Sequence, residues 1–325
     1  MRLLLAAACT IGLAGPNSAL DLQAPIGCSL GSECFVQQLP DRDAGSGHAD
    51  FRCEHLTYDG HNGTDFGLPT LAAMRAGVDV LAAASGRVVA VRDEMPDQLL
   101  TADRHDDVEG RECGNGVVLR HGHGWTTQYC HMALGSVRVS PGDQVEDGEV
   151  LGRVGLSGKT QFPHLHFVVR HNRTIIDPFD GAPLDRACSS AAPDQSLWSS
   201  SAEIVAASGG LLSAGIFDRI PEYSEIWDDA PNRQRISAHT EAIVHWAHFF
   251  GLRDGDVIES ELLAPDRTVL ASSRHVMDRN RATEFRAAGR RRPDGGWAAG
   301  IYVGKWRLLR NGAVVAEASI STQIE

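Results

Sequence analysis

The sequence predicts an all-β protein with two domains. The chain has 325 residues, more than the roughly 100–200 typical of one domain. Short runs rich in β-branched residues alternate with glycine-containing turns, first between Tyr58 and Phe179 and again in the C-terminal third, a pattern typical of strands. A serine-rich stretch separates the two sets. The expected segments are 20–56, an N-terminal wrap with three cysteines; 57–187, a first β-domain; 188–201, a linker; and 202–325, a small β-sandwich.

In the first domain, each expected strand is a short apolar run between turn residues. The charged stretch Met95–Glu112 lacks apolar periodicity and is expected to be a surface loop, whereas His121–Gly124 is expected to be the turn of a hairpin. The expected strands are Val78–Ala83, Gly86–Val91, Gly116–Leu119, Thr126–Tyr129, Val137–Val139, Val150–Val154 and His166–Val169.

The C-terminal third shows a second set of strands. Ala242–Phe250 is almost continuously apolar, which predicts a strand buried on both faces. Further runs at Val257–Leu263, Ala299–Val303 and Ala313–Ala316 complete the pattern expected of a β-sandwich. His245 and His248 lie on the predicted buried strand, so we expect them to be core residues. We also expect this domain to be separable from any site in the first domain.

Charge and the N-terminus limit the class of protein. A formal net charge of -12 argues against a nucleic-acid partner, which requires clustered Lys and Arg. Arg2 precedes an apolar run, Leu3–Ala14, and small residues follow, which predicts a secretory signal peptide over residues 1–19. The run is too short to cross a bilayer, which takes about 20 residues, and no later segment qualifies. A periplasmic or secreted protein is therefore expected. Lipid attachment at Cys9 is the less favoured alternative, because little apolar sequence precedes it.

The cysteines fit an exported protein. Without Cys9, the seven cysteines become six, and an even number in an oxidising compartment predicts disulfides. Folding the hairpin about its turn places Cys113 opposite Cys130, as a cross-strand bridge requires. Cys28 and Cys34 flank a short loop and could pair locally, which would leave Cys53 for Cys188. The sequence does not decide these last two pairs.

Two short motifs carry the candidate chemistry. The first is His61-Asn62-Gly63-Thr64-Asp65 and the second is His164-Leu165-His166. A catalytic zinc takes three imidazole or carboxylate ligands and keeps a fourth position open. His61, Asp65 and one histidine of the second motif supply that number. Alternate residues of a strand share a face, so His164 and His166 would point into one groove, with one as ligand and the other beside the metal.

Proton transfer needs a further group, because the helical His-Glu-x-x-His motif is absent. Histidine can serve, since its pKa lies near neutral. His131 ends the strand expected beside the groove and is the candidate. Each motif alone is weak evidence, since isolated histidines are more often structural than ligands. Tyr58 could donate a hydrogen bond in the groove, but core packing is favoured for it. His121 and His123 belong to the turn and are expected to be structural.

Four ordered blocks between residues 55 and 180 resemble the catalytic domain of lysostaphin/LytM-type zinc endopeptidases. The C-terminal third lies outside the resemblance. Relatives often carry a small residue where Cys130 precedes His131, and the expected disulfide would explain this departure. The blocks are His61–Asp65; Val80–Val88; Tyr129–Met132; and Gly142–Val145 continued through Gly155–Gly158 to Pro163–Phe167.

The resemblance implies roles for five residues. It makes His61, Asp65 and His166 the zinc ligands, and it gives His131 and His164 the task of orienting or deprotonating the attacking water. It further implies a β-sheet peptidase domain with an open groove that cleaves peptidoglycan stem or bridge peptides.

All five positions are intact, although some relatives have lost ligands and only activate amidases. The leading hypothesis is therefore a zinc D,D-endopeptidase of peptidoglycan, with peptidoglycan stem peptides as its partners. The alternative is a non-catalytic peptidoglycan-binding or amidase-activating regulator that uses the same groove. Whether a regulatory protein partner exists is left open.

Overall fold

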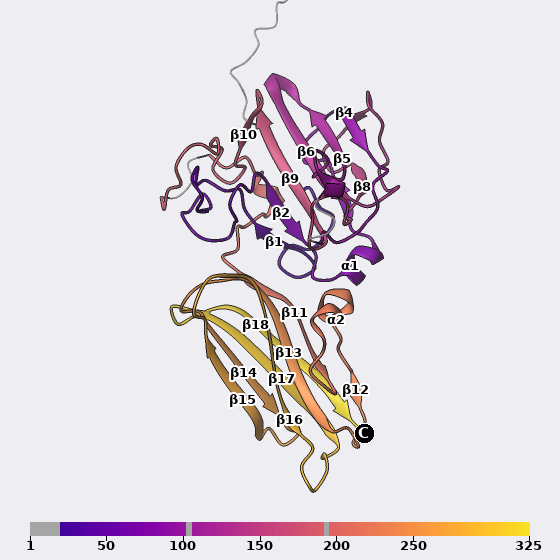
Figure 1. The fold of residues 1–325 in the computed structure, drawn as a ribbon, viewed down its shortest axis with the longest axis vertical. Coiled ribbons are helices and arrows are strands. Elements are labelled where there is room, and N and C mark those ends of the chain that lie inside the picture. The colour runs from indigo at the N-terminus through magenta and orange to yellow at the C-terminus, as the bar shows by residue number, and fades with distance from the viewer. Residues whose placement is uncertain (1–19, 102–105, 192–194) are drawn as a thin grey trace, which may run out of the picture.

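The structure is a computed structural model that describes residues 20–101, 106–191 and 195–325. Two β-rich bodies follow one another along the long axis of the molecule, the first domain at one end and the sandwich at the other (Figure 1). The predicted all-β class is confirmed. The expected signal peptide and Cys9 lie outside the described residues.

A single antiparallel sheet forms the centre of the first domain. Its order is β1-β2-β9-β6-β5-β4-β7, with β10 paired to β9, and β3 and β8 form a separate pair. The site-bearing strands β2, β9 and β6 are thus neighbours, with β1 on one side and β5 on the other. The elements are β1 Phe35–Gln38, β2 Thr64–Gly67, α1 Leu71–Ala76, β3 Asp79–Leu81, β4 Gly86–Arg92, η2 Asp106–Val108, β5 Asn115–Arg120, η3 Gly122–Gly124, β6 Trp125–Met132, β7 Gln144–Val145, β8 Val150–Arg153, β9 His164–His171 and β10 Thr174–Ile176.

The register of three adjacent strands brings the two motifs together. Asp65 on β2 pairs with His166 on β9, and His166 pairs on its other side with Cys130 on β6. His131 follows Cys130 directly and has a φ of 62°, a left-handed conformation that is uncommon outside glycine. Residues 101 positions apart in the chain therefore become cross-strand neighbours.

The predicted hairpin is confirmed. β5 and β6 pair with Val117 opposite Tyr129, and η3 forms the turn between them. All three disulfides are present in the structure: Cys113–Cys130, Cys28–Cys34 and Cys53–Cys188. The pairing that the sequence left undecided is therefore the local one.

One local prediction in the first domain is wrong and another is incomplete. Val137–Val139 is not a strand. In this stretch the Arg138 N–H donates a hydrogen bond to the Leu151 carbonyl. The stretch expected to be a surface loop carries Met95, Leu100 and Val108, which pack into a small buried cluster. These apolar residues are too widely spaced to give a periodic signal, so only the folded chain reveals that they meet.

Two sheets form the second domain, which is the expected sandwich. One sheet has the order β11-β13-β16 and the other β12-β18-β17-β14-β15. His245 and His248 on β13 are fully buried, as expected for core residues. The elements are η4 Ser200–Ala202, β11 Gly210–Phe217, α2 Tyr223–Asp229, β12 Arg235–Ile236, β13 Ala242–Leu252, β14 Val257–Leu263, β15 Val269–Val276, β16 Arg281–Arg291, β17 Gly300–Arg310 and β18 Ala313–Ile324.

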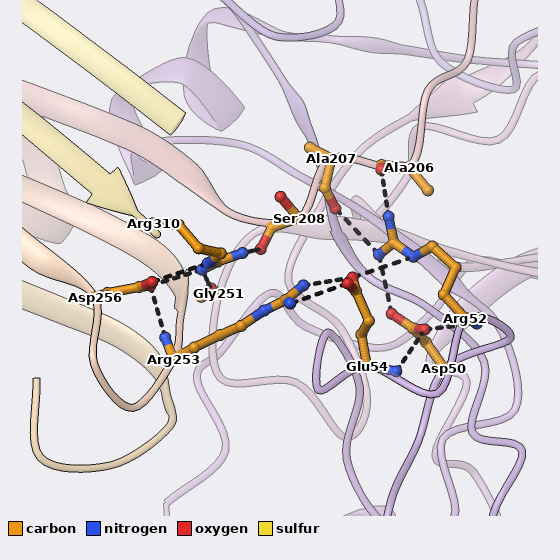
Figure 2. Close-up of polar contacts among 10 residues, drawn as sticks. All are labelled: Asp50, Arg52, Glu54, Ala206, Ala207, Ser208, Gly251, Arg253, Asp256 and Arg310. Carbon is orange, nitrogen blue, oxygen red and sulfur yellow. Dashed lines mark hydrogen bonds and ion pairs between the residues drawn. The ribbon is translucent and has the colours of Figure 1, made fainter. Parts of the chain in front are cut away.

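A polar cluster joins the two domains (Figure 2). Arg253 of the sandwich forms a two-pronged ion pair with Glu54 of the N-terminal segment. Arg52 donates to the carbonyl of Ala206 at 2.7 Å and also pairs with Asp50. Burial alone would raise the pKa of Glu54, but the hydrogen bond from Arg253 and the charge of Arg52 lower it. The ionised carboxylate is therefore the form that this contact stabilises.

Apolar contacts also cross the domain boundary. The rings of Phe35 and Phe250 lie 5.6 Å apart, and Phe250 belongs to the same buried cluster as the first domain's core. Leu197 and Trp198, which fall in the stretch expected to be a linker, are buried in that cluster too. The Leu22 N–H donates to the Leu197 carbonyl, so the short segment around Leu197 and Trp198 packs on the first domain.

Within the part of the chain that the structure describes, no helix is long and apolar enough to cross a membrane.

Candidate metal centre

Three donor atoms converge where β2 and β9 meet. His61, Asp65 and His166 each offer one ligand atom, and these atoms lie within 4.8 Å of one another. Asp65 Oδ1 is 2.7 Å from His166 Nδ1 and 3.1 Å from His61 Nε2, and the two imidazole nitrogens are 3.2 Å apart. His61 and Asp65 are buried and His166 is partly exposed, so the cluster opens to solvent on one side.

Hydrogen bonds on the far side of each ring fix which nitrogen faces the cluster. His61 Nδ1 donates to the Leu39 carbonyl at 2.7 Å, which leaves Nε2 with a free lone pair. His166 Nε2 contacts Asn62 Oδ1 at 3.0 Å, which leaves Nδ1 facing Asp65. Such outer partners orient the ligands of metal sites and raise their basicity. Asn62 lies within the first motif, but its part in the site was not anticipated from the sequence.

His131 and His164 lie beside the three donors. Their rings are 4.6 Å apart, and the His131 ring is 5.8 Å from that of His166. His131 Nδ1 donates to the Ser157 carbonyl and His164 Nδ1 to the Phe162 carbonyl. The Nε2 atom of each neutral ring therefore keeps its lone pair, and that of His164 lies 3.4 Å from Asp65 Oδ1.

The pKa values of Asp65 and of two of the histidines are lowered in the cluster. Burial raises the pKa of Asp65, but the neighbouring His61 and His164 outweigh it and hold that pKa well below its usual value. Burial lowers the pKa of His131 well below its usual value, and the charges of His164 and His166 lower it further. Burial also lowers the pKa of His164, against the pull of Asp65. The geometry thus surrounds one ionised carboxylate with imidazoles.

A groove of about 300 Å³ runs from the cluster along β9 and β6. His166, Val168 and Arg170 are alternate residues of β9 and line the groove, so Arg170 follows His166 on the same face. Arg170 Nη1 donates to Gln128 Oε1 at 2.8 Å. Within the described ranges no carboxylate forms an ion pair with Arg170. Tyr58, Asn62, Glu112 and Lys159 also line the groove.

The prediction that Tyr58 packs in the core is wrong. Its side chain is half exposed and lines the groove, and its ring stacks on that of His61 at 4.5 Å. His121, by contrast, is buried and structural, since its ring nitrogens contact the Ser85 carbonyl and the Thr127 hydroxyl. Arg170 and Gln128 carried no sequence signal, because only the strand register places them beside the motifs.

Comparison with known proteins identifies the first domain. The profile of peptidase family M23 matches residues 59–178, a span that holds all five candidate residues. Residues 59–178 are a peptidase family M23 domain. This confirms the resemblance to lysostaphin/LytM-type peptidases.

Each similar protein matches only part of this chain. Cell division protein DipM of Caulobacter vibrioides is 33% identical over 111 residues, which are 34% of this chain and 15% of that protein. Peptidoglycan DD-endopeptidase ShyA of Vibrio cholerae is 32% identical over 107 residues, 33% of this chain and 19% of that protein. The chain thus spans less than a fifth of these relatives. The solved catalytic domain of lysostaphin from Staphylococcus simulans is 28% identical, with a TM-score of 0.26 over 36% of this chain and 75% of that one.

Proposed function

We propose that this protein is a zinc-dependent endopeptidase that hydrolyses peptide cross-links of bacterial peptidoglycan, with the D,D-endopeptidase bond as its target. The observation that carries the proposal is the cluster of His61, Asp65 and His166 with two further histidines at the end of an open groove, inside an M23 domain. The relatives named DD-endopeptidases support the choice of substrate.

The donor set fits zinc. Zinc bonds of about 2.0–2.1 Å at tetrahedral angles place neighbouring donors about 3.3 Å apart. The three observed separations of 2.7, 3.1 and 3.2 Å are close to that value. The ligands supply two nitrogens and one carboxylate oxygen, a combination that catalytic zinc sites use, and the solvent-facing side leaves a fourth position. His61, Asp65 and His166 would hold the ion.

A zinc ion there would lower the pKa of a water molecule toward about 7 and polarise the scissile carbonyl. The chain's own residues do the rest. His131 and His164 keep Nε2 lone pairs beside the cluster, so a neutral ring can accept the proton of the attacking water and the imidazolium so formed can donate to the developing oxyanion. Asn62 keeps His166 in the tautomer that leaves Nδ1 for the ion.

The groove suits an extended peptide that carries a carboxylate. Arg170 offers a partly buried guanidinium without an acidic partner among the described residues, held in place by Gln128. It lies four residues beyond His166 on one strand, about 13 Å away at the usual rise per residue. Arginine binds carboxylates through paired N–H donors. We propose that Arg170 binds a carboxylate of the substrate that lies several bonds away from the scissile peptide bond.

We further propose that the protein acts outside the cytoplasm. The N-terminal sequence pattern and the three disulfides support export. A regulatory protein partner stays a hypothesis without structural support.

The test measures zinc and hydrolysis together. Purified mature protein should contain one zinc per chain and release defined fragments from isolated peptidoglycan, identified by mass spectrometry. Asp65→Ala removes the charged ligand and should abolish both zinc binding and hydrolysis. Asp59→Ala, also in the groove but outside the cluster, is the matched control and should retain zinc. Full zinc content and activity in Asp65→Ala would disprove the ligand assignment. Peptidoglycan binding without hydrolysis would favour the non-catalytic alternative.

A further inference from the structure

Helix α2 of the second domain contacts the first domain near the start of β9. In Figure 1 it lies next to α1, and Arg75 of α1 pairs with Asp228 of α2 at 2.9 Å. Arg75 Nη2 also donates to the Asp228 carbonyl. An exposed ion pair of this kind contributes little energy on its own. It shows where the two helices meet but does not account for the stability of their contact.

The contact continues through Trp227, which points from α2 into the first domain. Its ring packs against that domain's core cluster and lies 6.3 Å from the ring of Phe162. Behind it, the buried ring of His248 meets Trp227 edge-on at 4.8 Å, and Tyr223 meets both rings at right angles. Trp227 is thus held from the sandwich side and presented to the first domain.

Phe162 in turn determines the position of His164. The two rings stack 4.2 Å apart with an interplanar angle of 20°. The Phe162 carbonyl also accepts the hydrogen bond from His164 Nδ1 and the one from the Thr160 hydroxyl. Phe162 therefore contacts both the face of the His164 ring and its Nδ1 atom, which the Thr160 hydroxyl also contacts at 3.2 Å.

The sandwich is attached firmly enough to transmit this contact. Arg253 and Glu54 pair at the polar cluster of Figure 2, and Phe250 packs on Phe35 within a shared core. Together with the α1–α2 contact these attachments lie at separate places on the boundary. A hydrophobic interface restricts relative domain motion, and the contact of Phe250 with the first domain's core is of this kind.

We propose that the second domain positions His164 through the contact of Trp227 with Phe162, so that the sandwich is a working part of the peptidase. The proposal rests on the proposed function of the M23 domain. Trp227 is a positioning residue, since it touches neither the groove nor the donor cluster. Packing transmits the effect: without the indole, Phe162 can tilt away and His164 loses the ring that fixes its orientation.

The test uses the full-length, zinc-loaded chain and five variants. Trp227→Ala should lower kcat on a purified cross-linked muropeptide about tenfold to a hundredfold, the scale expected for a misplaced catalytic group, with KM and zinc content unchanged. Trp227→Phe should recover most of the loss. Phe162→Ala should lower kcat similarly, and the double variant should add little, because residues acting through one another are not additive. Trp297→Ala, in another cluster of the sandwich core, is the matched control and should leave kcat unchanged.

A second readout does not depend on turnover. The side-chain nitrogen resonances of His164, assigned by their absence in His164→Gln, should shift in Trp227→Ala and stay in place in Trp297→Ala. Unshifted resonances together with wild-type kcat in Trp227→Ala would overturn the proposal. Increased hydrolysis would also overturn it, because Trp227 would then restrict the active site and not position His164. A wild-type protein without hydrolysis would refute the proposed function, while the resonances would still decide this inference.

Discussion

Removal of the Cys113–Cys130 bridge should both destabilise the M23 domain and slow catalysis. The bridge joins β6 to the residues before β5, directly beside His131. The Cys113 carbonyl accepts the His131 N–H at 2.8 Å, and Gln128, which holds Arg170, donates to Cys113 Sγ. A Cys113→Ala/Cys130→Ala double variant would therefore loosen the backbone under His131 and one wall of the groove.

Loop length sets the expected loss of stability. A disulfide restricts the unfolded chain, and the restriction grows with the logarithm of the loop. The sequence separation of 17 residues corresponds to about 3 kcal/mol. The separations of 6 for Cys28–Cys34 and 135 for Cys53–Cys188 correspond to about 2 and about 5 kcal/mol. When each bridge is removed in turn, the loss of stability should therefore increase with the length of the loop that the bridge closes.

The assay combines unfolding and kinetics. Thermal midpoints of the three double variants, measured without reductant, give the ranking, and kcat on a soluble muropeptide gives the functional effect. The Cys113→Ala/Cys130→Ala variant should lose about tenfold in kcat, whereas Cys28→Ala/Cys34→Ala should keep its activity because that bridge lies in the N-terminal segment. Cys28→Ala/Cys34→Ala is therefore the matched control.

Two results would refute this reasoning. If peptide mapping of unreduced protein finds free thiols at both 113 and 130, the bridge does not form. If the double variant keeps the wild-type midpoint and kcat, the bridge supports neither the fold nor His131.

Three further predictions follow from the structure. His131→Ala and His164→Ala should each retain zinc and lose about 10²–10⁴-fold in kcat, the usual contribution of a positioned acid or base; near wild-type turnover in either would remove that histidine from the mechanism. Arg170→Gln should raise KM for a peptide with a free carboxylate about tenfold and leave the amidated peptide unaffected, and equal effects on both peptides would contradict the assigned contact. Burial raises the pKa of Asp177 to about 7, above its unfolded value of about 3.9, so the folded state binds the proton more tightly and stability falls as pH rises from about 4 to 7. Asp177→Asn should therefore stabilise the protein at pH 8 by up to about 4 kcal/mol and have little effect at pH 4, as chemical denaturation at the two pH values would show; a loss of stability at pH 8 would mean that the ionised carboxylate stabilises the buried Arg42 nearby.

The sequence by itself determined the features that depend on short spacing. The four-residue step from His61 to Asp65 and the alternation of His164 and His166 predicted a donor cluster and a shared strand face, which the structure places together. β-Branched runs between glycine turns predicted the all-β class. The hairpin turn predicted the Cys113–Cys130 bridge. Each of these rests on spacing within one motif, one strand or one hairpin, where the backbone leaves little choice.

Only the tertiary structure decided the features that join distant parts of the chain. The sequence suggested a separable second domain, but Arg253 meets Glu54 across 199 positions and Phe250 completes a core begun by Phe35. Arg170 lies in the groove because β9 pairs with β6, and Trp227 meets Phe162 because two domains dock. Local sequence carries no signal for such contacts, since the pairing of strands and the burial of complementary surfaces select them after each element has formed.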